Sequence, residues 1–225
     1  MTIRGLIFDF DGLILDTETP AFLAWQAVFA AHACELPLAV WADSIGRNPN
    51  HFAPCRYLEE RLGHPVDCEA VRRDQSKEEA KLIEAQAILP GVEDYLASAR
   101  RLGLKVGLAS SSDRAWVNRH LERLGLQEQF AVIRTADDVE RTKPEPELYL
   151  SALAALELEP REAIALEDSG HGVQAAKRAG LFCVAVPNPL TRELGIGPAD
   201  LLIDSLADVP LGKVLEIAEK RQARA

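Results

Sequence analysis

The sequence has no apolar run long enough to cross a membrane. A helical span needs about 20 consecutive apolar residues, and no stretch of this 225-residue chain approaches that length. Internal repeats and low-complexity segments are also absent from the sequence. We therefore expect a cytoplasmic globular protein without a membrane partner, long enough for one large domain or for a core with a smaller companion.

Positive charge is in short supply. The chain has 25 lysines and arginines against 35 aspartates and glutamates, which gives a net charge of −10. Binding to nucleic acid needs a positive field against the phosphate backbone, so we expect no nucleic-acid partner. A small phosphate ligand is compatible with this charge, because a single site can be locally positive. We expect a monomer, and a dimer is left open.

Cysteine is scarce and widely spaced. The four cysteines, Cys34, Cys55, Cys68 and Cys183, form no C-x-x-C pair. A chain of this length does not need disulfides to fold, and the spacing matches no zinc site. We therefore expect all four to be reduced thiols.

Six short apolar runs are typical of buried parallel strands, because they are continuous and rich in Val, Ile and Leu. Helical patterns separate several of them, at 113–125, 146–158 and 172–180. Strands that alternate with helices predict a doubly wound, mostly parallel α/β sheet. The predicted strands are residues 5–10, 105–110, 130–135, 163–168, 182–187 and 200–204.

Residues 17–89 show helical patterns and no strand of this type. The patterns cover 21–33, 51–63 and 67–87, and Pro90-Gly91 then marks the return to the sheet. This stretch is too long for an ordinary connection between strands. We expect two domains: an α/β core formed by 1–16 and 90–225, and an α-helical cap formed by 17–89 that covers the end of the first strand.

Polar residues follow four of the predicted strands. In a doubly wound sheet, ligands bind outside the carboxyl ends of the strands, so we expect these residues to converge. They are Asp9 and Asp11 after the first strand, Ser110, Ser111 and Ser112 after the second, Lys143 after the third, and Glu167 and Asp168 after the fourth.

This set of residues suits phosphoryl transfer. Clustered carboxylate oxygens are ligands that Mg²⁺ accepts together with waters and phosphate oxygens. A carboxylate can attack phosphorus to form an aspartyl-phosphate, and Lys143 and Ser110 could balance the charge on the phosphoryl oxygens. Asp11 lies on the same side of the chain as Asp9 and could act as a general acid and base.

Four segments resemble, in order, the four motifs of the haloacid dehalogenase superfamily. They are "DFDGLILDTE", "LASSS", "KPEP" and "EDSGHGVQAAKRAG". The pattern is more narrowly similar to the β-phosphoglucomutase-like phosphatase branch, whose members carry a helical cap after the first motif. The motifs span residues 9–180, and the architecture covers nearly the whole chain.

The resemblance implies a role for each matching residue. Asp9 is the expected nucleophile and Asp11 the expected general acid/base. The residues expected at the phosphate or substrate are Ser110, Lys143, Gly12, Ser111 and, in the cap, Arg47. The residues expected to bind Mg²⁺ are Asp9, Asp11 through its backbone carbonyl, and Asp168, with Glu167 in or next to that set. Ser112 is expected mainly to cap the following helix.

The expected function is Mg²⁺-dependent hydrolysis of a small phosphate monoester, either a sugar phosphate or a nucleotide-like phosphate. Dehalogenases of the superfamily lack the second aspartate, so Asp11 argues for phosphoryl chemistry. The alternative is a phosphosugar mutase, although mutases of this branch have a histidine where this chain has Ala21. A receiver domain of a response regulator is a further alternative, which would lack both the D-x-D spacing and the helical insertion.

Overall fold

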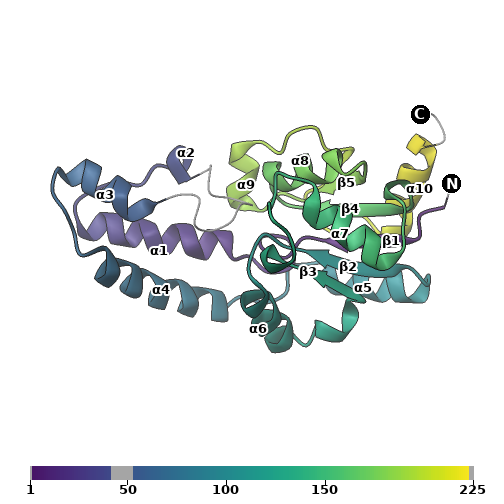
Figure 1. Ribbon diagram of the computed structural model, residues 1–225, viewed down its shortest axis with the longest axis horizontal. Helices are drawn as coiled ribbons and strands as arrows, with labels where there is room; N and C mark the ends of the chain where they lie inside the picture. Colours follow the sequence, from purple (N-terminus) through teal and green to yellow (C-terminus); the bar gives the residue numbers. More distant parts are fainter. Residues whose placement is uncertain (1, 42–52, 223–225) are drawn as a thin grey trace.

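A six-stranded parallel sheet forms the centre of the molecule (Figure 1). The computed structural model describes residues 2–41 and 53–222. The strand order is β3-β2-β1-β4-β5-β6, so the chain builds the sheet outward from β1 in one direction and then in the other. The strands are β1 Gly5–Phe8, β2 Lys105–Ala109, β3 Val132–Arg134, β4 Ala163–Glu167, β5 Phe182–Ala185 and β6 Leu201–Leu202.

All six predicted strands are confirmed, each shorter than its apolar run. The predicted runs extend beyond the strands because the residues at their carboxyl ends leave the hydrogen-bonded ladder. These residues form the turns that carry polar side chains. Asp9, Ser110 and Asp168 each come directly after the last residue of a strand. The prediction of a doubly wound parallel α/β sheet is therefore correct.

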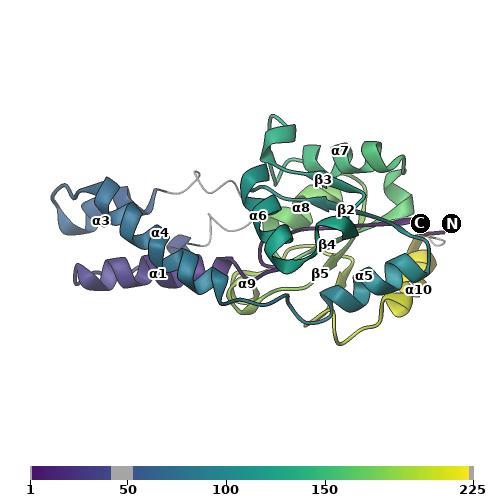
Figure 2. The same cartoon turned by 90° about the horizontal axis from the view of Figure 1, so that it is seen from below.

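Helices cover both faces of the sheet, as the apolar strands require. One hydrophobic cluster joins the strands to α5 (Val92–Arg101), α6 (Arg114–Leu124) and α10 (Leu211–Gln222). A second joins the opposite face to α7 (Glu147–Leu156) and α8 (Gly170–Arg178). Figure 2 shows α7 and α5 on opposite sides of the strands. Short 3₁₀ helices lie in the connections: η2 Gln127–Gln129, η3 Ala136–Asp138 and η4 Pro160–Glu162.

Four of the helices described between β1 and β2, those that precede α5, form a separate group beyond the carboxyl ends of the strands (Figure 1). We call this group the insert. Phe22, Trp25 and Phe29 of its first helix pack in a hydrophobic cluster of their own, as their helical spacing predicts. Leu190 of α9 (Pro189–Leu194) also belongs to this cluster. The helices are α1 Glu18–Ala31, α2 Leu38–Trp41, α3 Pro54–Leu62 and α4 Cys68–Glu84.

The two chain segments that join the insert to the sheet run next to each other. Leu15 and Ile88 form an antiparallel bridge, and the Leu89 N–H donates to the Ile14 carbonyl at 2.9 Å. The chain therefore enters and leaves the insert at one place, close to the end of β1.

The prediction that all four cysteines are reduced thiols is wrong for two of them. Cys55 of α3 and Cys68 of α4 form a disulfide. The packing of α3 against α4 brings their Cα atoms to 5.8 Å, within the range that a disulfide spans. Sequence spacing alone does not show this packing. Cys34 and Cys183 are free thiols.

No helix in the described part of the chain is both long enough and apolar enough to span a bilayer.

Candidate active site

The candidate site lies where the strand order reverses. The chain leaves β1 toward β2 and β3, and it returns to the other side of β1 with β4. At such a switch point the connections diverge and leave a crevice outside the carboxyl ends of the strands. Asp9 follows β1, Asp168 follows β4 and Ser110 follows β2, so the fold brings together residues that are far apart in sequence.

A buried lysine links two of the carboxylates. Lys143 Nζ lies 2.6 Å from Asp9 Oδ1 and 2.6 Å from Glu167 Oε1. The Tyr149 hydroxyl of α7 also donates to Glu167 Oε1. Lys143, Asp9 and Glu167 are each at most 4% exposed, so their charges interact in a medium that screens them little. These contacts fix Lys143 beside Asp9.

Three carboxylates in this crevice could hold a metal ion. Asp9, Glu167 and Asp168 each offer an oxygen, and these oxygens lie within 4.8 Å of one another. Asp168 Oδ1 is buried and has no hydrogen-bond partner among the described residues. Because Lys143 balances one of the three negative charges, a divalent cation would complete the neutralisation. An all-oxygen donor set of this kind fits Mg²⁺.

The pKa values show the repulsion within this cluster. Burial raises the pKa of Asp9 to about 8, and the Glu167 carboxylate adds to the rise while Lys143 opposes it. Burial also raises the pKa of Asp168 well above its usual value, and Asp9 and Glu167 increase the effect. Burial alone would lower the pKa of Lys143, but Asp9 and Glu167 raise it above its usual value. The cluster is therefore one that a bound cation would stabilise.

Asp11 accepts hydrogen bonds from four side chains of the described residues. Ser112 Oγ donates to Asp11 Oδ2 at 2.7 Å and Ser110 Oγ donates to the same oxygen at 3.2 Å. Thr17 Oγ1 and the Trp116 indole Nε1 donate to Asp11 Oδ1 at 2.8 and 3.0 Å. All four partners are donors, so the carboxylate is held as a hydrogen-bond acceptor at the rim of the site.

Ser112 differs from the prediction that it mainly caps a helix. Asp113 is the N-cap of α6, since its side chain accepts from the Trp116 N–H at 2.7 Å. Ser112 is thereby free to turn toward Asp11. Trp116 lies within the helical pattern predicted at 113–125, and its contact with Asp11 has no signal in the sequence.

Gly12 lies against the carboxylate cluster. Its φ angle is +81°, and a Cβ built on it would lie 2.0 Å from Asp168 Oδ2 and 2.8 Å from Asn188 Nδ2. Only glycine fits this backbone conformation and this space. Of the other residues expected at the substrate, Ser111 is buried next to Ser110, and Arg47 lies outside the described residues.

Asn188 is a site residue that sequence reasoning missed. Its Nδ2 donates to Asp168 Oδ2 at 2.8 Å. Its Oδ1 accepts from the Leu190 and Thr191 N–H groups, both at 2.9 Å, and thereby caps α9. The sequence carries no signal that this amide both caps a helix and reaches Asp168.

Comparison with known proteins identifies relatives over the whole length. The family model described as haloacid dehalogenase-like hydrolase matches residues 6–186, which include all four motifs. YhcW of Bacillus subtilis (strain 168), which is named provisionally as a phosphatase, is 48% identical over 214 residues and covers 95% of this chain and 97% of its own. Validoxylamine A 7'-phosphate phosphatase of Streptomyces hygroscopicus subsp. limoneus is 32% identical over 205 residues. That match covers 90% of this chain and 94% of the relative.

Among solved structures, the β-phosphoglucomutase of Clostridium difficile superposes with a TM-score of 0.77. The match covers 99% of this chain and 100% of that one, at 23% sequence identity. At this identity the likeness concerns the fold, and it extends over the insert as well as the sheet.

Proposed function

The chain belongs to the family of haloacid dehalogenase-like hydrolases, and we propose that it is a Mg²⁺-dependent phosphatase acting on a small phosphate monoester, a sugar phosphate or a nucleotide-like phosphate. One observation carries the proposal: the Asp9 carboxylate is ion-paired with a buried lysine at the switch point of the sheet and lies beside two further carboxylates. Both relatives are named as phosphatases, and one of them is named for a phosphate ester, which supports the same chemistry.

In the first half of the proposed reaction, Asp9 is the nucleophile. One of its oxygens forms a bond to phosphorus while the bond between phosphorus and the ester oxygen breaks. Asp11 gives its proton to that oxygen, so the alcohol leaves neutral. Lys143 and Ser110 balance the charge on the phosphoryl oxygens from fixed positions.

In the second half, water cleaves the aspartyl-phosphate. Asp11 takes a proton from the attacking water, and the bond between phosphorus and Asp9 breaks to release inorganic phosphate. The four side chains that donate to Asp11 fix the position of its carboxyl group for both steps.

The residues that would hold Mg²⁺ are Asp9 and Asp168, with the Asp11 carbonyl expected from the family motif and Glu167 adjacent through its contact with Lys143. When bound, the ion neutralises charge on the carboxylates and on the phosphoryl oxygens. In the same proposal, 17–89 acts as the cap over a core of 1–16 and 90–225, and it excludes water while the phosphoenzyme forms.

A phosphosugar mutase is less well supported. The position at which mutases of this branch carry a histidine is Ala21, which is apolar and packs against the hydrophobic cluster of the insert. No described contact supplies a replacement for that side chain.

The test is phosphate release from a panel of phosphate monoesters, with and without Mg²⁺, with product isomers followed in parallel. We expect Mg²⁺-dependent release that is lost in Asp9→Asn and in Asp11→Asn, while circular dichroism shows both variants folded. Isomer formation without free phosphate would instead establish the mutase. Full turnover in Asp9→Asn would contradict the mechanism.

A further inference from the structure

One residue that follows the sheet in sequence is buried in the hydrophobic cluster of the insert. Leu190, in the first turn of α9, is 8% exposed, and all other buried members of its cluster come from the insert. As formed by the described residues, neither hydrophobic cluster of the sheet contains Leu190. The first turn of α9 is therefore covered by the insert, although α9 belongs to the chain that follows β5.

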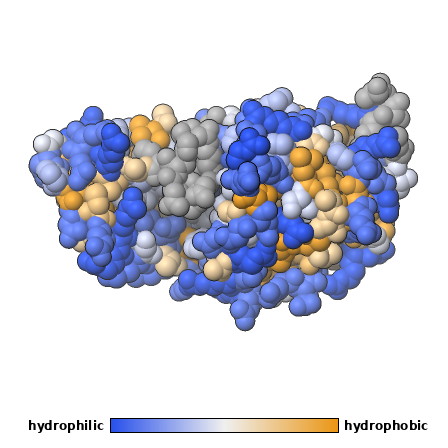
Figure 3. Space-filling view, viewed as in Figure 1, coloured by the Kyte–Doolittle hydropathy of each residue, from blue (hydrophilic) through white to orange (hydrophobic). Residues whose placement is uncertain are grey.

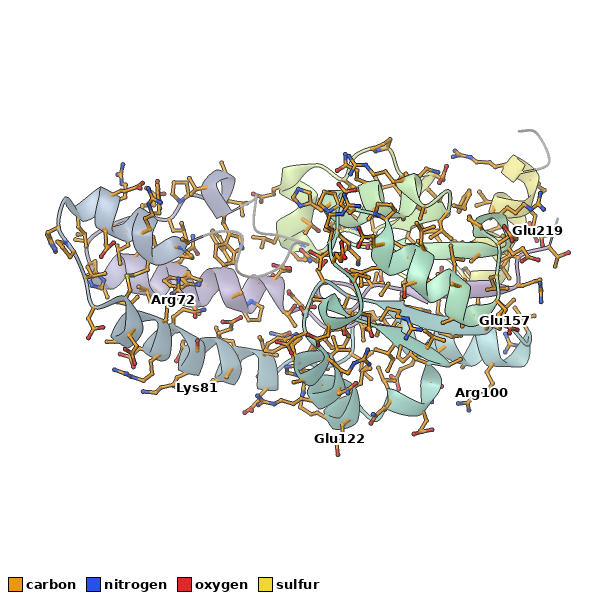
Figure 4. All side chains as sticks on the ribbon, in the orientation of Figure 1. Arg72, Lys81, Arg100, Glu122, Glu157 and Glu219 are labelled. Atoms are coloured by element: carbon orange, nitrogen blue, oxygen red, sulfur yellow. A yellow bond between two sulfur atoms is a disulfide. The ribbon has the colours of Figure 1, made fainter. Side chains whose placement is uncertain are left out.

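The insert turns its polar residues outward and its apolar residues toward this cluster. Lys81 of α4 points away from the insert (Figure 4), and the surface over α4 is mainly hydrophilic (Figure 3). On the inner side, Phe22 and Trp41 are buried, and their ring centroids lie 6.0 Å apart. Since α1 and α9 also lie against each other, Leu190 is a point at which the core contributes to the interior of the insert.

The residue two positions before Leu190 holds a carboxylate of the candidate site. Asn188 Nδ2 donates to Asp168 Oδ2 at 2.8 Å. Asn188 Oδ1 accepts from the N–H groups of Leu190 and Thr191, both at 2.9 Å. Because both ends of the amide are bonded, the position of Asn188 follows the first turn of α9, and the position of Asp168 Oδ2 follows Asn188.

The other oxygen of Asp168 is available to a ligand. Asp168 Oδ1 is buried and has no hydrogen-bond partner among the described residues, and Asp168 belongs with Asp9 and Glu167 to the group that could hold a metal ion. A carboxylate that is hydrogen-bonded through one oxygen presents the other in a defined direction. Contacts therefore run without interruption from the insert, through Leu190 and Asn188, to an expected ligand of Mg²⁺.

We propose that Leu190 is a positioning residue: by packing into the insert it holds Asn188 against Asp168, so that the position of the insert and the affinity for Mg²⁺ are linked. The inference rests on the proposed function, because it takes Asp168 as a ligand of Mg²⁺. Linkage of this kind is reciprocal. An insert that is seated on α9 strengthens Mg²⁺ binding, and bound Mg²⁺ favours the seated insert by the same factor.

The first test is calorimetry of the full chain with Mg²⁺ alone. Leu190→Ala removes the apolar contact with the insert but keeps the backbone N–H that donates to Asn188. We expect its Kd for Mg²⁺ to rise about fivefold, at the lower end of couplings between sites. Leu190→Met, which conserves the volume and the apolar contact, should bind Mg²⁺ as the wild type does.

Leu58→Ala is the matched control. Leu58 is a buried leucine of the same cluster, but it belongs to α3, at the end of the insert away from α9 (Figure 1). This variant should loosen the packing of the insert and leave the Kd for Mg²⁺ unchanged. Equal weakening in Leu58→Ala and Leu190→Ala would overturn the role of Leu190.

A double-mutant cycle tests whether Leu190 acts through Asn188. In Asn188→Ser the group that donates to Asp168 is absent, so adding Leu190→Ala should change the Kd for Mg²⁺ less than about twofold. Additive effects would mean that Leu190 acts by another route, and they would overturn the proposal.

Hydrogen exchange followed by mass spectrometry measures the reciprocal effect. In the wild type, Mg²⁺ alone should slow the exchange of the α1 amides, by up to the factor found for the Kd, and it should not do so in Leu190→Ala. Unchanged exchange with Mg²⁺ bound, or equal Kd values for Leu190→Ala and the wild type, would overturn the linkage and leave the phosphatase standing. A wild type that binds no Mg²⁺ would overturn both. An intact linkage without phosphate release from any ester would overturn the phosphatase alone.

Discussion

At position 12 the backbone passes so close to Asp168 that a side chain has no room. Gly12→Ala would place a methyl group 2.0 Å from Asp168 Oδ2 and would also strain a φ angle of +81°. We expect this variant to displace Asp168 and to lower kcat/KM about 100-fold, as small misplacements in active sites do. Steady-state kinetics with a titration of Mg²⁺ would measure the effect.

Gly63→Ala is the matched control for this change. Gly63 has a φ angle of +73°, and no atom lies within 4 Å of the point that an added methyl group would occupy. The substitution therefore introduces strain of roughly 1–2 kcal/mol without a clash. It should lower the free energy of unfolding and leave kcat/KM unchanged. A similar loss of activity in both variants would mean that strain, and not the position of Asp168, is responsible.

Asn188 holds one carboxylate oxygen of Asp168, Oδ2, whereas Oδ1 has no hydrogen-bond partner among the described residues. Asn188→Ser keeps an oxygen that can cap α9 but removes the Nδ2 group that donates to Asp168 Oδ2. Since groups that orient metal ligands typically contribute 10–100-fold to affinity, we expect Mg²⁺ to bind about tenfold more weakly. Calorimetry with Mg²⁺ alone would measure this, and an unchanged Kd would show that Asp168 is held by other means.

The sequence indicates the residues of the site that follow strand ends, because parallel strands end at one edge of the sheet. Asp9, Ser110 and Asp168 belong to this group. Trp116, Tyr149 and Asn188 could not be assigned in this way, and Ser112 was expected at this edge but mainly as a helix cap. Their roles depend on how the helices that carry them pack against the sheet. In the sequence alone, each of them is typical of a helix cap, a core residue or a turn.

At the scale of elements, α6 carries a buried histidine whose ring is surrounded by apolar and aromatic groups. His120 is 2% exposed, and neither ring nitrogen has a hydrogen bond among the described residues. Its ring packs against Phe10 and Trp116. His120→Leu would remove two unsatisfied polar atoms, so we expect the free energy of unfolding to rise by about 1–2 kcal/mol. Urea denaturation at pH 7.5 would measure it.

The same residue should make stability depend on pH. Burial lowers the pKa of His120 below its ordinary 6.5, and Arg123 and Arg119 lower it further. Protonation therefore favours the unfolded state, and the stabilisation present above pH 6.5 is lost as the pH falls from 6.5 toward the folded pKa. For His120→Leu, the free energy of unfolding should decrease less than that of the wild type as the pH falls below 6.5. Parallel curves for the two proteins would contradict the assignment.

The elements themselves were largely predictable, for reasons that differ between them. The strands are continuous apolar runs because both faces are covered, and α6 has a clear stripe that ends at Gly125. The Cys55–Cys68 disulfide was not predictable, because it depends on how α3 packs against α4. The short helix α9 was missed, since six residues contain too little periodicity to recognise.

At the scale of the whole molecule, the carboxylate cluster should link stability to metal. If Mg²⁺ binds only the folded chain, a concentration of about 100 times Kd stabilises it by about 2.7 kcal/mol, which raises Tm by roughly 5–10 °C for a chain of this size. We expect this rise in thermal unfolding with Mg²⁺ relative to EDTA. The expected cause is neutralisation of Asp9, Glu167 and Asp168.

Asp168→Asn should remove most of this rise. Without metal, the variant should be at least as stable as the wild type, because it lacks one of three mutually repelling buried charges. Asp204→Asn, which changes an exposed carboxylate, should keep the full effect of Mg²⁺. A Mg²⁺ shift that survives in Asp168→Asn would place the ion elsewhere.

The two chain segments that join the insert to the sheet limit how the insert can move relative to the sheet. Leu15 forms a β-bridge with Ile88, and the Leu89 N–H donates to the Ile14 carbonyl. The two chain segments that join the insert to the sheet are therefore held together along one edge of the insert. Rotation about that edge displaces each residue in proportion to its distance from it. Along α4, Ile83 lies nearest that edge, and Glu79 and Gln75 follow at about one turn each. A small change of angle therefore moves Gln75 more than Glu79, and it moves the first turn of α4 more than either.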